Sequence, residues 1–100
     1  MARYAISYHF LDDAGAADRR ASLLREIARC KRAWSDGGSL SLVETPEPIA
    51  LLEARLYLDS SLNAVKDQLL VIELGDAAAG RGAFADRDGL RALLPGAAIA

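Results

Sequence analysis

The sequence contains few residues that can bind metals or cross-link the chain. Among 100 residues there is one cysteine, Cys30, and one histidine, His9. A single cysteine excludes an intramolecular disulfide, so the fold must be held together by packing, as is usual in a reducing compartment. Zinc and catalytic iron sites need several His, Cys or carboxylate ligands at defined spacing. His9 and Cys30 stand alone on different predicted elements, so no metal site and no cofactor are predicted.

The sequence also lacks a long apolar run. No stretch approaches the roughly 18–20 residues of a membrane span, and the start, MARYAISYHF, is not that of a secretory signal. The net charge is −2, whereas a domain built to neutralise phosphates is usually basic. With 52% hydrophobic and 26% charged residues, the composition is that of an ordinary globular domain. We therefore expect a cytoplasmic protein without membrane contact.

Hydrophobic periodicity predicts the order strand, helix, strand, strand, helix, strand. The predicted elements are strands at 3–10, 33–35, 39–44 and 68–74 and helices at 17–32 and 46–59, the second helix starting with a Thr45 cap and Pro46. This order predicts an α/β (α+β) domain over residues 1–75, the ferredoxin-like βαββαβ fold with two helices on one face of a four-stranded antiparallel sheet. Residues 76–100 are predicted to be a C-terminal extension, partly flexible or packed on a dimer partner, with a short helix at 88–94.

The last strand of this domain is apolar on both faces. Leu70, Ile72 and Leu74 alternate with Leu69 and Val71, a pattern typical of a strand that is covered twice. The two helices cover only one face, so the other must be covered by the C-terminal tail or by a second copy of the chain. We favour the second copy and predict a homodimer that forms through the open sheet face.

Two groups of charged residues are candidate sites. Arg25, Arg29 and Arg32 follow the spacing i, i+4, i+7 and would form a basic stripe on the first helix, able to lie along an RNA or DNA backbone. The alternative is an ordinary solvated helix face with cations near its C-terminus. Asp12 and Asp13 follow the first strand and could hold Mg²⁺, although adjacent loop carboxylates are more often a solvated turn.

Several short segments resemble a known group of small proteins. The segments are Tyr4–Tyr8, Ser39–Val43, Leu58–Ser60 and Asp67–Gly75. They resemble the SinR-type small proteins, which are similar to the small ferredoxin-like subunit of CRISPR spacer-acquisition complexes and to virulence-associated ribonuclease toxins. The resemblance implies a homodimer and, for several CRISPR members, a metal-dependent nuclease whose key carboxylate follows a tyrosine at the end of the first strand. In this sequence that position is His9, after Tyr8.

The sequence therefore predicts a non-catalytic homodimer of this CRISPR-associated-like type that docks nucleic acid or protein. One alternative is a metal-dependent endoribonuclease that uses Asp12 or Asp13, with Mg²⁺ as its cofactor and His9 as a further catalytic candidate. Another is a structural or regulatory interaction module that does not contact nucleic acid.

Overall fold

The computed structural model describes residues 1–100. A four-stranded antiparallel sheet is formed by β1 (Ala2–His9), β2 (Arg32–Ser35), β3 (Leu40–Thr45) and β4 (Gln68–Glu73) in the order β2-β3-β1-β4, with helices α1 (Ala16–Ile27) and α2 (Ile49–Leu58). The C-terminal unit contains β5 (Ala79–Gly80), α3 (Arg87–Leu93) and β6 (Ala98–Ile99). The element order and the strand order are those of the predicted ferredoxin-like α+β fold.

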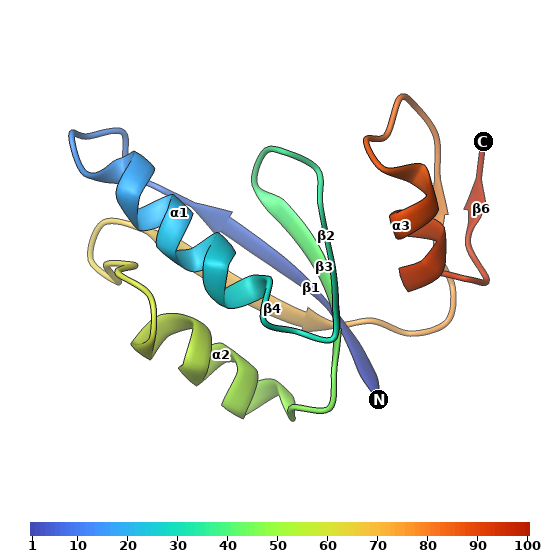
Figure 1. The fold of residues 1–100 in the computed structure, drawn as a ribbon, viewed down its shortest axis with the longest axis horizontal. Helices are drawn as coiled ribbons and strands as arrows, with labels where there is room; N and C mark the ends of the chain where they lie inside the picture. The colour runs from blue at the N-terminus through green and yellow to red at the C-terminus, as the bar shows by residue number, and fades with distance from the viewer.

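The larger core lies between the sheet and helices α1 and α2. Alternation along β1 turns Tyr4, Ile6 and Tyr8 to this side, and all three are at most 1% exposed. Leu23 and Ile27 from α1 pack against them, together with Leu52 and Leu56 from α2. Figure 1 shows α1 and α2 on the same side of the sheet. The two phenol groups are also satisfied, because Tyr8 Oη bonds Ser41 Oγ at 2.9 Å and Tyr4 Oη donates to Glu47 O at 2.7 Å.

The opposite face of the sheet is covered over β2 and β3 by the C-terminal unit of the same chain (Figure 1). Trp34 and Leu42 pack there against Leu90 and Leu93 of α3, and all four are buried. Residues 76–100, predicted to be partly flexible or packed on a dimer partner, pack in this structure on the sheet of their own chain. The apolar surface of the β2–β3 hairpin provides the physical reason, since the tail is the nearest cover for it.

Arg3 connects the C-terminal unit to the domain. Arg3 lies on β1, an inner strand of the sheet. Its guanidinium donates to Leu93 O at 3.2 Å and forms an ion pair with Asp76 at 3.0 Å. Trp34 Nε1 donates to Ala85 O at 2.8 Å. These contacts satisfy polar groups at the junction, so the second layer is anchored by hydrogen bonds as well as by apolar packing.

Two helix boundaries differ from those predicted. α1 ends at Ile27 rather than near Arg32, because the chain turns inward there and buries Cys30. The carbonyl of Glu26, near the end of the helix, accepts a hydrogen bond from Arg55 Nη1 at 2.8 Å. α2 begins at Ile49 after Pro48, and Thr45 is the last residue of β3 instead of the helix cap. None of the three helices is long and apolar enough to cross a membrane.

Candidate functional site

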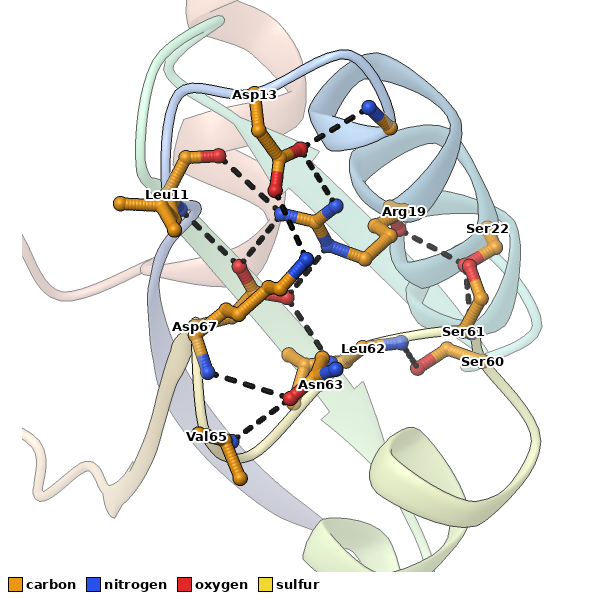
Figure 2. A network of polar contacts seen from close by, with 12 residues as sticks. Leu11, Asp13, Arg19, Ser22, Ser60, Ser61, Leu62, Asn63, Val65 and Asp67 are labelled. Atoms are coloured by element: carbon orange, nitrogen blue, oxygen red, sulfur yellow. Dashed lines mark hydrogen bonds and ion pairs between the residues drawn. The ribbon is translucent and has the colours of Figure 1, made fainter.

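One polar network of the molecule centres on the carboxylate of Asp67, directly before β4 (Figure 2). Its side chain is fully buried and accepts four hydrogen bonds. Two come from Arg19, with Nε to Oδ2 at 2.9 Å and Nη2 to Oδ1 at 3.1 Å, and two from the backbone amides of Leu11 and Asn63. Asp67 therefore joins the loop after β1, helix α1 and the loop before β4 at one end of the sheet.

Asp13 lies in the same network. Arg19 Nη1 donates to its Oδ1 at 2.8 Å, the amide of Gly15 donates to the same oxygen at 3.0 Å, and Lys66 Nζ lies 3.3 Å from Oδ2. The hydrogen bond from Arg19 is the main cause that lowers the pKa of Asp13 to about 2, and Lys66 adds to it. The same guanidinium also lowers the pKa of Asp67 against the effect of burial. Both carboxylates are therefore ionised at neutral pH and already neutralised by cations of the protein.

The other two candidates at this end of the sheet, His9 and Asp12, do not join the network. His9 is the last residue of β1, exposed and opposite Gln68 of β4, and Asp12 is exposed in the loop. No group of three or more His, Cys, Asp or Glu side chains is placed to hold a metal ion. A cation at Asp13 would have to displace Arg19 and Lys66, which occupy both carboxylate oxygens. This arrangement is suited to holding loops together, and it offers no pair of free carboxylates for Mg²⁺.

The predicted basic stripe is not a single helix face. Arg25 is in the last turn of α1 and exposed, Arg29 follows the helix, and Arg32 begins β2. Arg29 forms an ion pair with Glu26 at 3.0 Å, and Arg32 with Glu44 at 3.5 Å. Two of the three arginines are thus partly neutralised by neighbouring carboxylates, which reduces what they could contribute to binding a phosphate backbone.

A second, half-buried ion pair holds the other end of the helical layer. Arg55 of α2 binds Glu47 through two hydrogen bonds, Nε to Oε2 at 2.7 Å and Nη2 to Oε1 at 2.8 Å, and it also contacts Cys30 Sγ at 3.4 Å. The hydrogen bonds from Arg55 lower the pKa of Glu47. Burial raises the pKa of the Cys30 thiol despite this neighbouring cation. Cys30 therefore lacks the thiolate character that a nucleophilic cysteine requires.

One exposed apolar surface lies on β4. Leu70 and Ile72 face the side of the sheet away from α1 and α2 and are 57% and 49% exposed. β4 is also an edge strand. Its sequence, Gln68–Glu73, has no proline, and its only charge is at its last residue, although edge strands are usually protected by such residues. This surface was predicted from the sequence, and it is the part of the open face that the tail leaves uncovered.

No protein-family model matches the chain, no curated protein is significantly similar to it, and no solved structure matches its fold significantly. The functional evidence therefore consists of the residues themselves. Sequence reasoning missed the pairs of Arg19 with Asp67 and Arg55 with Glu47. The first joins residues 48 positions apart, a contact that no local spacing indicates.

Proposed function

We propose that this protein is a non-enzymatic interaction module that self-associates into a homodimer through β4. The observation that carries the proposal is the exposure of Leu70 and Ile72 on an unprotected edge strand. The two charged candidates are less suited to a function of their own, because Asp13 is bound by Arg19 and Lys66 and two of the three stripe arginines have acidic partners. The resemblance to small CRISPR-associated subunits also implies a homodimer.

The hydrogen-bonding direction of β4 supports pairing along its edge. Leu74 N donates to Arg3 O at 2.8 Å, so position 74 faces β1, as do positions 72 and 70 by the antiparallel alternation. The amides and carbonyls of Leu69, Val71 and Glu73 consequently point to the free edge. A strand that pairs there can satisfy all of them, as in the addition of a β-strand to an exposed sheet edge.

A second copy of β4 fits this edge in a symmetric antiparallel register. In this register Val71 of one copy lies opposite Val71 of the other, at the two-fold axis. Leu70 of each copy then lies opposite Ile72 of the other, which gives two such pairs, one on each side of the axis. These would be the non-hydrogen-bonded positions, where cross-strand side chains come closest. The pairing joins the two four-stranded sheets into one and brings these aliphatic side chains of the two copies into contact across the seam. An isologous two-fold contact of this kind is the commonest form of oligomer.

Sedimentation equilibrium of the wild-type protein and of Leu70→Lys/Ile72→Lys tests the proposal. The wild type should sediment as a dimer at micromolar concentration, and the double variant as a monomer with wild-type circular dichroism. Val65→Lys is the control for placing a lysine at an aliphatic surface residue, because Val65 is 96% exposed in the loop before β4. It adds one of the two positive charges of the double variant. A wild-type protein that is monomeric at high micromolar concentration, or a double variant that still dimerises, would overturn the proposal.

A further inference from the structure

An apolar cavity lies between the sheet and the C-terminal unit. Its volume is about 190 Å³, and it is lined by strands β2 and β3 on one side and by β5, α3 and β6 on the other. The lining residues are Trp34, Leu40, Leu42, Ala78, Ala79, Gly80, Phe84, Leu90, Leu94, Ala97 and Ile99. Ala79 is exposed, so the cavity reaches the surface at β5. The function proposed above does not involve this space.

The cavity exists because small residues line its outer wall. Ala78, Ala79 and Ala97 have no side chain beyond Cβ and cannot reach across to Leu42 or Leu90. Gly80 is held against the ring of Phe84, where an added Cβ would lie 3.1 Å from Cζ. The wall therefore cannot be filled from that position without moving the ring. Without an occupant, the surrounding aliphatic and aromatic side chains lack dispersion contacts on one side.

The chemistry of the lining is uniform. No charged side chain contributes to it, and ten of its 11 residues are hydrophobic, the exception being Gly80. The indole N–H of Trp34 is the one polar side-chain group of the lining, and it already donates to Ala85 O. An occupant would thus find no free side-chain hydrogen-bond partner and no counter-ion, which excludes charged and strongly polar molecules.

The aromatic walls and the volume together specify the occupant. Trp34 and Phe84 lie edge to face, with ring centroids 6.3 Å apart and an interplanar angle of 65°. Such edges and faces provide favourable contacts for a third ring. An engineered apolar cavity of roughly 150 Å³ is large enough for benzene, and the present cavity is somewhat larger. We infer that this cavity binds a small uncharged aromatic molecule, a single ring of the size of toluene.

Trp34 is the only tryptophan of the chain and lines the cavity, so its fluorescence reports on binding. Toluene titrated into the wild-type protein should change this fluorescence saturably, with a dissociation constant on the order of 1 mM or tighter. It should also shift the NMR methyl signals of Leu90 and Ile99 and raise the Tm. Benzoate has nearly the same shape and carries a negative charge, and it should cause none of these changes.

Two alanine variants separate binding in the cavity from binding elsewhere. Ala97→Leu fills the cavity and should weaken toluene binding at least tenfold. Ala92→Leu makes the same change at an exposed position of α3 outside the lining and should bind like the wild type. If Ala97→Leu lacks the wild-type circular dichroism, Ala78→Leu replaces it. The inference is overturned if toluene causes no saturable change in the wild type, if Ala97→Leu binds it undiminished, or if benzoate binds equally well. None of these outcomes depends on whether the protein dimerises.

Discussion

Replacing Asp67 by alanine should be the most destabilising single change at the polar end of the domain. The side chain is completely buried, and the variant would remove four hydrogen bonds at once. Arg19, whose side chain is only 12% exposed, would keep one carboxylate partner, Asp13, and the amides of Leu11 and Asn63 would lose theirs. Breaking a buried ion pair by removing one partner costs about 3–5 kcal/mol.

A loss of this size is large for a domain of 100 residues, because total stabilities are about 5–15 kcal/mol. Each kcal/mol shifts the Tm of such a domain by about 4–8 °C, so Asp67→Ala should lower the Tm by roughly 12 °C or more. Asp67→Asn keeps the volume and part of the hydrogen bonding and should cost about 1–3 kcal/mol. The loss in free energy of unfolding of each variant is measured by urea unfolding monitored by circular dichroism, with the free energy extrapolated to water.

Asp12→Ala is the matched control for this experiment. Asp12 is the neighbour of Asp13 in the same loop, but it is exposed and takes part in none of the ion pairs. The control should therefore change the stability by no more than about 0.5 kcal/mol. A loss below about 1 kcal/mol in Asp67→Ala, or an equal loss in Asp12→Ala, would refute the view that this carboxylate holds the three segments together.

Three further predictions concern pH and the charged candidates. The pKa of Asp13 is about 2 in the folded state and 3.8 ordinarily, so in acid the unfolded chain binds more protons than the folded one. The free energy of unfolding, measured with urea at a series of pH values, should therefore be constant above about pH 5 and fall between about pH 4 and pH 2. A maximum of stability below pH 4 would contradict this. Single-stranded RNA should not be cleaved with Mg²⁺, and cleavage that is lost in Asp12→Ala/Asp13→Ala would revive the nuclease hypothesis. Any RNA binding should depend weakly on salt, and Arg25→Ala/Arg29→Ala should change the log–log slope by less than about 1; a steep slope that flattens in this variant would show that these arginines dock nucleic acid.

The parts of the fold that depend on strong periodicity could be predicted from the sequence. Tyr4, Ile6 and Tyr8 alternate with smaller or polar residues, and this period of two placed β1 in the sheet with the correct residues inside. Leu23 and Ile27 recur at helical spacing and are the buried residues of α1. Side-chain burial against a neighbouring layer is what produces these patterns, so they are visible without knowing the neighbour.

The ends of elements and the C-terminal unit could not be predicted in the same way. The end of α1 depends on Arg55, which binds the carbonyl of Glu26 from another helix. β5 and β6 are two residues long and consist largely of small residues, so neither has a measurable period. The prediction that three arginines share one face of the first helix is wrong for the same reason. Arg29 and Arg32 continue the helical spacing of Arg25, but they lie beyond the end of the helix. A tertiary contact decided the boundary, and local spacing contains no information about it.

The position of α3 also decides how two copies could meet. The sequence favoured packing through the whole open face of the sheet, but α3 stands on that face over β2 and β3. Two sheets that pack directly lie about 10 Å apart, and a helix with its side chains is itself about 10–12 Å wide. The helix of one copy would therefore prevent the two sheets from packing directly on one another over β2 and β3. The free edge and the exposed pair Leu70 and Ile72 are both on β4, so pairing along this edge brings apolar side chains of the two copies into contact while the C-terminal unit stays folded on its own sheet.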